Sequence, residues 1–133
     1  MEEELPYNGL HKNCNRTIQF LNDMGRTDLS AYGIDKDTVI FDAGAVCVRN
    51  DFRQFKLGTR LIEESLTMAR DEGAQFYIVH AVNSFAKRIF DKFNFVSANE
   101  IVYETYFAGD EEVLSRRQPQ HTSAHYLIKN IQK

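Results

Sequence analysis

The sequence has 133 residues, the size of one domain with a single hydrophobic core. Hydrophobic residues make up 43% and charged residues 26% of the chain, with only 7 Gly and 2 Pro, so the composition excludes a disordered or fibrous protein. The formal net charge of -3 argues against a cationic field that would hold a nucleic-acid backbone or an anionic membrane surface.

The two cysteines, Cys14 and Cys47, lie in apolar patterns without a Cys-x-x-Cys spacing, which supports neither a disulfide framework nor a metal site. No apolar run approaches the roughly 18–20 residues of a membrane span, and the acidic start MEEELPYNG is unlike a signal peptide. We therefore expect one cytoplasmic domain over residues 1–133, with residues 1–9 disordered and with no nucleic-acid, membrane or metal partner.

The first half of the chain predicts helix, strand and helix. An apolar stripe over residues 10–21, ended by Gly25, is typical of an amphipathic helix. After a turn-rich segment, the apolar run 39–48 predicts a strand that is buried on both faces and carries the single charge Asp42. A second apolar stripe predicts a helix over residues 57–71.

The second half predicts one more buried strand and helix, followed by two strands. The run 76–82 reads FYIVHAV, and Asn83 follows it as a good helix N-cap for the stripe 85–93. Alternating patterns predict strands at 101–107 and 123–131. The order contains a βαβ unit, so we expect an α/β fold with a mixed, mostly antiparallel sheet around a central parallel pair.

The loop before the second helix reads RQFKLGT, from Arg53 to Thr59. A junction from strand to helix directs backbone N–H groups and the positive helix end at one point, which suits a phosphate or pyrophosphate. Arg53 and Lys56 add positive charge. The loop is neither a Walker loop nor a G-x-G-x-x-G loop. The alternative is an ordinary turn with solvated basic residues.

The segment 48–61, VRNDFRQFKLGTRL, resembles the acetyl-CoA signature R/Q-x-x-G-x-G/A of the Gcn5-related N-acetyltransferases, with Lys56 in place of the first glycine. The segment 83–95, NSFAKRIFDKFNF, is similar to the family's N-x-x-A-x-x-[LV]-[YF]-x-K-x-G-F helix, with Asn94 in place of the glycine. Two motifs in the right order, with a strand between them, make the resemblance specific.

The segments 16–37 and 119–131 are similar to insect and nematode arylalkylamine N-acetyltransferase-like proteins. The family fold normally begins with a strand, two helices and two further strands, whereas the resemblance here begins near Asn15. The resemblance therefore implies an N-terminally short acetyltransferase fold: a short isoform, a fragment, or a protein that completes its sheet otherwise.

The resemblance implies acetyl-CoA as cosubstrate and a primary amine, an arylalkylamine, as acetyl acceptor. It also implies that the strand is splayed at Gly44 to admit the pantetheine arm. The cofactor-binding residues that it implies are Val46, Cys47, Val48, Arg53, Gln54, Phe55, Lys56, Leu57, Gly58, Thr59, Asn83, Ala86 and Phe90.

Catalysis is less well supported, because Phe90 stands where the family often has a tyrosine that acts as general acid. Val82 and Ala86 stand where insect relatives have serines. Asp42 is the best remaining proton acceptor, although a carboxylate paired at a strand end is the alternative. We expect His80 to be a core histidine. A second hypothesis is therefore a non-catalytic CoA-binding or partner-binding module, with homodimerisation through an open sheet edge.

Overall fold

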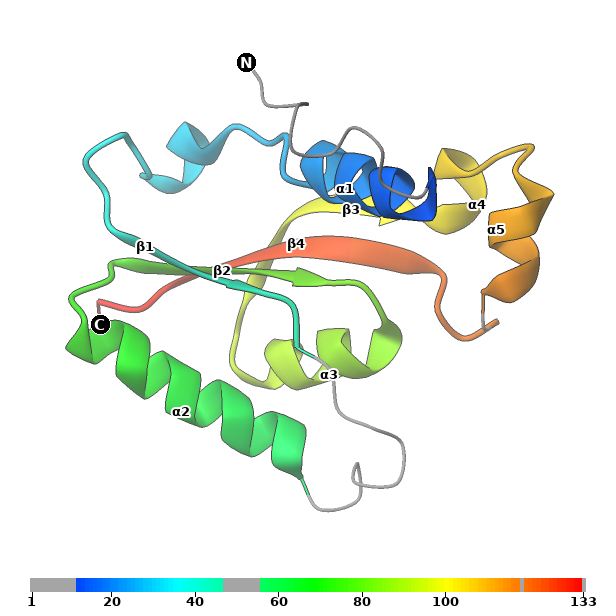
Figure 1. Ribbon diagram of the computed structural model, residues 1–133. Coiled ribbons are helices and arrows are strands. Elements are labelled where there is room, and N and C mark those ends of the chain that lie inside the picture. The colour runs from blue at the N-terminus through cyan, green and yellow to red at the C-terminus, as the bar shows by residue number, and fades with distance from the viewer. Residues whose placement is uncertain (1–11, 47–55, 118, 133) are drawn as a thin grey trace.

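The computed structural model describes residues 12–46, 56–117 and 119–132. The expectation about residues 1–9 lies outside this range. A four-stranded sheet with strand order β1-β2-β4-β3 runs through the middle of the molecule (Figure 1). The strands are β1 (Ile40–Gly44), β2 (Phe76–Ala81), β3 (Val96–Val102) and β4 (Ser123–Asn130).

The pairing of these strands confirms the predicted fold class. β1 and β2 are parallel neighbours, and both β2 and β3 pair antiparallel with β4. The helix α2 (Leu57–Asp71) connects the parallel pair, as the predicted βαβ unit requires. The chain therefore has a mixed α/β fold in which β1 is an edge strand among the described residues.

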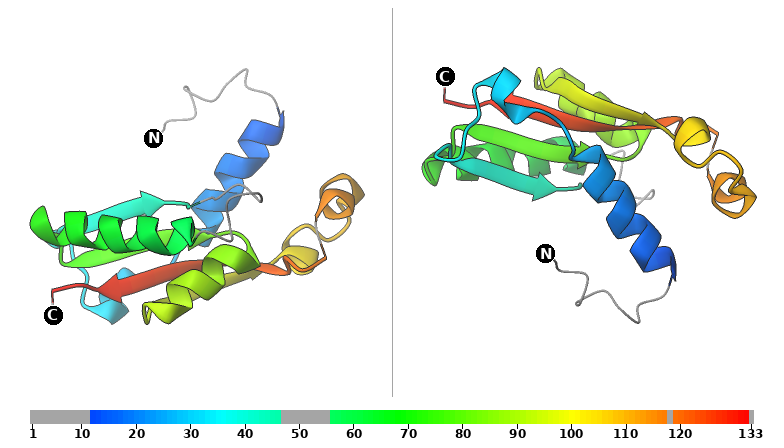
Figure 2. Two further views of the ribbon diagram at one scale, coloured as in Figure 1. Left: turned by 90° about the horizontal axis from the view of Figure 1, so that it is seen from below. Right: turned by 90° about the horizontal axis from the view of Figure 1, so that it is seen from above.

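Helices cover both faces of the sheet (Figure 2). On one face lie α2 and α3 (Ser84–Lys92), and on the other lies α1 (Lys12–Met24). The shorter helices are η2 (Leu29–Tyr32), α4 (Tyr103–Tyr106) and α5 (Glu111–Arg116). Each face has its own core cluster. No helix in the described part of the chain is both long enough and apolar enough to cross a membrane.

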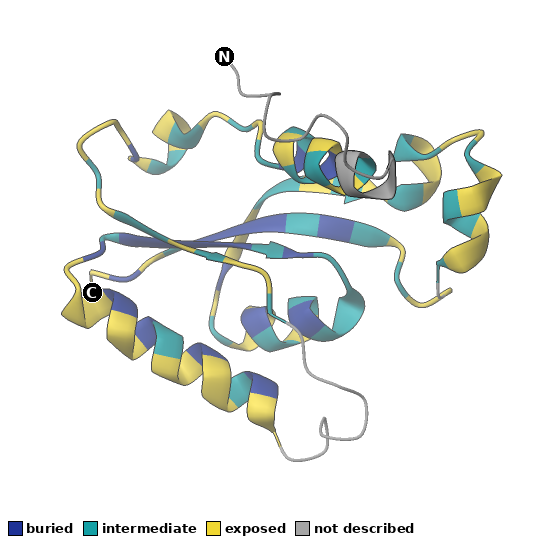
Figure 3. Cartoon of the chain, viewed as in Figure 1, coloured by how far each residue is buried: buried dark blue, intermediate teal, exposed yellow. Residues whose placement is uncertain are grey.

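The helix bounds follow local sequence signals. In α2, the buried residues Gly58, Ile62, Leu66 and Ala69 recur every three or four positions and form one stripe (Figure 3). Asn94, which stands in place of the motif glycine after α3, has a left-handed backbone with φ 65°. These two helices end and begin as the sequence predicted.

The strand predicted over 39–48 is shorter and less buried than expected. β1 ends at Gly44, and Asp42 and Gly44 are exposed, so burial on both faces was wrong. The physical reason is the edge position: β1 has a ladder partner on one side only, and its outer groups face solvent in the described structure. Cys47 and Val48 lie outside the described residues.

The strand predicted over 101–107 was also wrong. β3 lies earlier, and Tyr103 begins the helical turn α4 instead. The same letters place Tyr103, Tyr106 and Phe107 at i, i+3 and i+4, so that a helical turn packs all three rings against Phe20 at centroid distances of 5.2–5.7 Å. Burial of this aromatic cluster outweighs the alternating pattern.

The polar segment 109–120 contains a helix that was not predicted. Asp110 caps α5 by accepting the Val113 N–H. Arg16 of α1 then forms ion pairs with Asp110 and Glu112 at 3.5 and 3.2 Å. A contact with a distant helix therefore stabilises this short helix, which a local pattern could not indicate.

Candidate functional site

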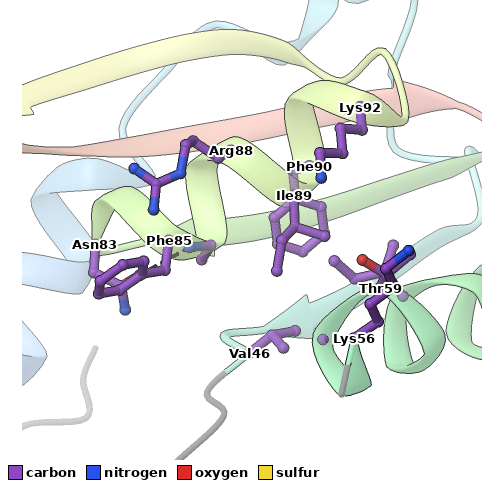
Figure 4. Close-up of a pocket in the computed structure, with 12 residues that line it drawn as sticks. Val46, Lys56, Thr59, Asn83, Phe85, Arg88, Ile89, Phe90 and Lys92 are labelled. Carbon is purple, nitrogen blue, oxygen red and sulfur yellow. Dashed lines mark hydrogen bonds between the residues drawn. The ribbon is translucent and has the colours of Figure 1, made fainter. Parts of the chain in front are cut away.

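A cleft of about 250 Å³ opens between the N-terminal end of α2 and one side of α3 (Figure 4). Val46, just after β1, forms its third side. The cleft lies on the face of the sheet that carries α2 and α3, because residues of both helices line it. Its lining residues are Val46, Lys56, Gly58, Thr59, Ile62, Asn83, Phe85, Ala86, Arg88, Ile89, Phe90 and Lys92.

The cleft gathers most of the described residues that the sequence predicted as cofactor-binding. Leu57 is the exception, because it does not line the cleft and is 41% exposed. The residues that the structure brings together are Val46, Lys56, Gly58, Thr59, Asn83, Ala86 and Phe90. The predicted residues Cys47, Val48, Arg53, Gln54 and Phe55 lie outside the described range.

The N-terminal end of α2 borders the cleft, and no described side chain caps it. Lys56 is the N-cap, has left-handed backbone with φ 58°, and makes no capping hydrogen bond through its side chain. Arg60 N–H donates to Lys56 O at 3.1 Å, so the N–H groups of residues 57–59 precede that bond. Gly58 is buried here and lets the backbone approach a ligand. Such a helix end suits an anion.

The N-terminal end of α3 borders the same cleft but is closed by protein groups. Asn83 Oδ1 accepts the Ala86 N–H at 2.9 Å, as expected for the predicted N-cap. Ser84 N–H donates to His121 Nδ1 at 3.1 Å. Asn83 therefore has a structural role in addition to its place in the cleft.

Several cleft residues were missed by the sequence analysis. Arg88, Ile89 and Lys92 of α3 line the cleft together with the predicted Phe90. The Arg88 guanidinium lies 5.0 Å from the ring centroid of Phe85, in a cation–π contact. The signal that could have found them is helical spacing, because positions 85, 88, 89 and 92 share one side of a helix.

The backbone of β1 has a bulge next to the cleft. Asp42 pairs with Ile78, whereas Gly44 pairs with Val79, so the register shifts between Asp42 and Gly44. Gly44 has φ 72°, and its N–H donates to Asp42 Oδ1 at 2.9 Å. A glycine inside a strand often marks such a bulge, and the register shift here coincides with Gly44.

Titratable side chains gather near this bulge, on the opposite face of the sheet from the cleft. The Asp42 carboxylate is exposed, and His80 Nδ1 lies 3.3 Å from Gly44 O. His80 and Tyr126 are cross-strand partners with ring centroids 5.0 Å apart. Burial raises the pKa of Tyr126, and the Asp42 charge raises it further. The sequence analysis missed Tyr126, because its proximity depends on strand pairing.

No described acid replaces the family tyrosine at Phe90. Phe90 is fully buried, with its ring centroid 4.9 Å from that of Phe95. The Tyr103 hydroxyl, in the core cluster of the opposite face, donates a hydrogen bond to Val82 O, and burial raises the Tyr103 pKa to about 12. Tyr103 therefore holds its proton at neutral pH. Among the described residues, no group of His, Cys, Asp and Glu side chains is arranged to hold a metal ion.

Known protein structures share this arrangement of helices and strands. No family model and no curated protein sequence matches the chain. Arylalkylamine N-acetyltransferase 2 from Aedes aegypti is a structural neighbour with a TM-score of 0.73 and 25% identity over 87% of this chain. Polyamine N-acetyltransferase from Drosophila melanogaster, which forms N-acetylagmatine, aligns with a TM-score of 0.56 and 22% identity over 68% of this chain.

The chain spans about half of these neighbours, since the alignments cover 53% of the Aedes protein and 44% of the Drosophila protein. A mosquito arylalkylamine N-acetyltransferase-like protein, 5b, aligns at 16% identity over 77% of this chain and 47% of its own, with a TM-score of 0.61. The resemblance that the two motifs indicated is confirmed at the level of structure: the described chain has the Gcn5-related N-acetyltransferase fold.

Proposed function

We propose that this chain binds acetyl-CoA and transfers its acetyl group to a small primary amine. The observation that carries the proposal is the cleft, in which the open N-terminal end of α2 and the side of α3 meet beside the β1 bulge. Described residues of both sequence motifs line its two walls. Structural neighbours that are N-acetyltransferases support the same activity.

In the proposed complex, the pyrophosphate lies against the N–H groups of residues 57–59 with Lys56 beside it. The pantetheine arm runs from there along the main chain at Val46 and reaches Asn83. The register shift at Gly44 disturbs the β1–β2 ladder locally, which supports a path for the thioester toward the opposite face. Of the predicted pantetheine contacts, Val48 lies outside the described residues.

The amine then attacks the thioester carbon, so that a C–N bond forms and the C–S bond breaks. Asp42 takes the proton that the amine loses, with His80 and Tyr126 beside it, and solvent protonates the departing thiolate. Positioning alone supplies effective molarities on the order of 10⁵ M or more. A general acid typically raises the reaction rate by about 10² to 10⁴-fold, and without one we expect a slow enzyme.

For the acceptor we propose an arylalkylamine, supported by the Aedes aegypti neighbour and by the sequence resemblance. The agmatine-acetylating neighbour makes polyamines the class to compare. We also propose a cytoplasmic location, in line with the two cysteines and their lack of disulfide spacing.

Titration calorimetry with acetyl-CoA tests binding, and thiol release over a panel of arylalkylamines and polyamines tests transfer. Asp42→Asn should lower turnover while acetyl-CoA affinity stays the same. Asp71→Asn, at the exposed end of α2, is the matched control. A folded wild-type protein without affinity for acetyl-CoA would contradict the proposal, and full activity of Asp42→Asn would remove Asp42 from the mechanism.

The second hypothesis, a CoA-binding module without catalysis, is favoured by the buried phenyl ring of Phe90 at the acid position. It expects acetyl-CoA binding without thiol release for any amine of the panel. The same two measurements therefore separate the two functions.

The partner-binding version of this hypothesis is supported by the edge of β1. Val39 is 52% exposed beside it, and Leu61 and Met68 of α2 are 52% and 51% exposed. These α2 residues lie on the flank away from Thr59 and the cleft, toward β1. Two-fold antiparallel pairing of β1 with a second copy would bring the two α2 helices to about 10 Å, a normal packing distance. Light scattering that shows a stable monomer would contradict this pairing.

A further inference from the structure

A serine, a histidine and a glutamate lie together on β3 and β4, away from the cleft. Ser97 Oγ is 2.9 Å from His125 Nδ1, and Glu100 Oε2 is 3.7 Å from His125 Nε2. Ser123 Oγ is 3.2 Å from the same Nε2. The lining of the cleft between α2 and α3 includes none of these four side chains. The proposed acetyl transfer therefore gives this cluster no role.

Strand pairing brings these side chains together on the sheet face that carries α3. Glu100 and His125 are direct cross-strand partners, and Leu127, two positions after His125, belongs to the core cluster under α2 and α3. The register shifts between Ser97 and Asn99, so β3 has one extra residue there. The shift puts Ser97 and Glu100 on one face, whereas a regular strand would place residues three positions apart on opposite faces.

The neighbours of His125 set the direction of its hydrogen bonds. A carboxylate only accepts, so Glu100 beside Nε2 favours the tautomer with the proton on Nε2. Nδ1 then carries a lone pair, and the Ser97 hydroxyl is the donor in the 2.9 Å bond. A further acceptor for this hydroxyl, Asn99 O, is more distant at 3.3 Å. The imidazole is therefore placed to remove the Ser97 proton.

The serine of this cluster is exposed, whereas the histidine side chain is only 16% exposed. Burial lowers the pKa of His125 below its usual 6.5; among the charged groups that face it, Lys87 acts in the same direction, and Glu100 and Asp91 oppose it. At pH 7 the imidazole is therefore a neutral base, next to a hydroxyl that solvent reaches. A hydroxyl bonded to a base that a third group orients is the arrangement that activates serine for acyl transfer.

We propose that Ser97 is a nucleophile toward activated acyl esters, with His125 as its general base and Glu100 as the group that orients the imidazole. Ser97 Oγ attacks the ester carbonyl carbon, and its proton passes to His125 Nδ1. The new C–O bond forms, the bond to the leaving oxygen breaks, and that oxygen takes the proton from Nδ1. Water then attacks acyl-Ser97, with its proton passing through Nδ1 to Ser97 Oγ. This activity goes beyond the proposed function and does not depend on acetyl-CoA binding.

The test uses p-nitrophenyl acetate, with the release of p-nitrophenol and mass spectrometry of the acetylated peptides as readouts. General-base assistance predicts that Ser97 reacts about 100-fold faster than the exposed Ser115, whose hydroxyl donates to Glu112 O. Ser97→Ala and His125→Gln should each abolish the Ser97-dependent release, and Ser115→Ala, the matched control, should retain it. Glu100→Gln, at an exposed position, should lower it about threefold.

The pH profile is a readout that a purely structural hydrogen bond would not move. After subtraction of the Ser97→Ala rate, release should be constant from pH 8 to 6.5 and fall only at lower pH, because the lowered pKa keeps His125 neutral. An unchanged rate in Ser97→Ala, full activity of a folded His125→Gln protein, or equal acetylation of Ser115 and Ser97 would overturn the proposal. An unchanged rate in Glu100→Gln would overturn the role of Glu100. Each of these outcomes leaves acetyl-CoA binding in the cleft as a separate question.

Discussion

The N-terminal ends of α2 and α3 border the same cleft, yet their backbone donors are satisfied differently. At α3, Asn83 Oδ1 and His121 Nδ1 accept the N–H groups of Ala86 and Ser84. At α2, Lys56 is the N-cap and offers no capping acceptor. Two helices with similar positive ends therefore differ: protein groups accept the first N–H groups of α3, whereas none of the described side chains caps α2, where we propose that a ligand binds.

The two helix ends therefore have different roles. The closed end of α3 fixes a wall of the cleft and its side chains, while the open end of α2 supplies the anion site. The cost of the open end is local strain at Lys56, a residue other than glycine with φ 58°. Strain and missing caps at α2, against a regular cap at α3, are the pattern expected for a binding end and a structural end.

The largest expected effect comes from filling the open end. Gly58→Trp places an indole where the α2 backbone meets the cleft, so affinity for acetyl-CoA should fall by at least about 100-fold in calorimetry. Glu64→Trp, on the exposed side of the same helix, should bind like the wild type. Unchanged affinity of a folded Gly58→Trp protein would show that α2 does not hold the cofactor.

A second variant asks whether the α3 wall lacks only a proton donor. Phe90→Tyr adds a hydroxyl at the side of the cleft, and turnover in the thiol-release assay should rise about tenfold or more. A hydroxyl at this fully buried position also costs roughly 1–3 kcal/mol of stability if it finds no partner. If turnover does not change, the missing acid does not limit the reaction.

A pair of variants compares the two helix ends directly through stability. Asn83→Ala removes the α3 cap and should lower the free energy of unfolding by about 1 kcal/mol. Lys56→Gly relieves the left-handed backbone at α2 and should raise it by about 1 kcal/mol, with weaker CoA binding from the lost charge. Urea denaturation measures both. Changes of the same sign would contradict the division into a structural end and a binding end.

The smallest effect concerns pH and the side of α3 that carries the Lys87–Asp91 pair. Burial lowers the pKa of His125 below its usual 6.5, with Lys87 acting in the same direction and Glu100 and Asp91 opposing it. Below pH 6.5 the unfolded chain therefore gains a proton that the folded chain resists, and stability falls. His125→Gln should show a smaller drop in Tm between pH 7.5 and 5.5. An identical drop would assign the pH dependence to other groups.

Local signals in the sequence predicted much of this structure. The apolar stripe of α2, the N-cap Asn83 and the left-handed Asn94 each depend on residues within one or two helical turns, so the sequence pattern is sufficient to place them. The family resemblance also predicted seven of the twelve described residues that line the cleft. Their positions on α2 and α3 follow from the βαβ connection, which the order of elements determines.

Only the tertiary structure decided the rest. The alternating pattern after Val102 became a helical turn. In a helical turn, the rings of Tyr103, Tyr106 and Phe107 lie on one side and can all pack against Phe20 of α1. Strand pairing brought Tyr126 beside His80, and the edge position left Asp42 exposed where burial was expected. Sequence periodicity determines which side of an element is apolar. Segments far away in the chain determine what packs against that side, and therefore also which side chains meet in the candidate site.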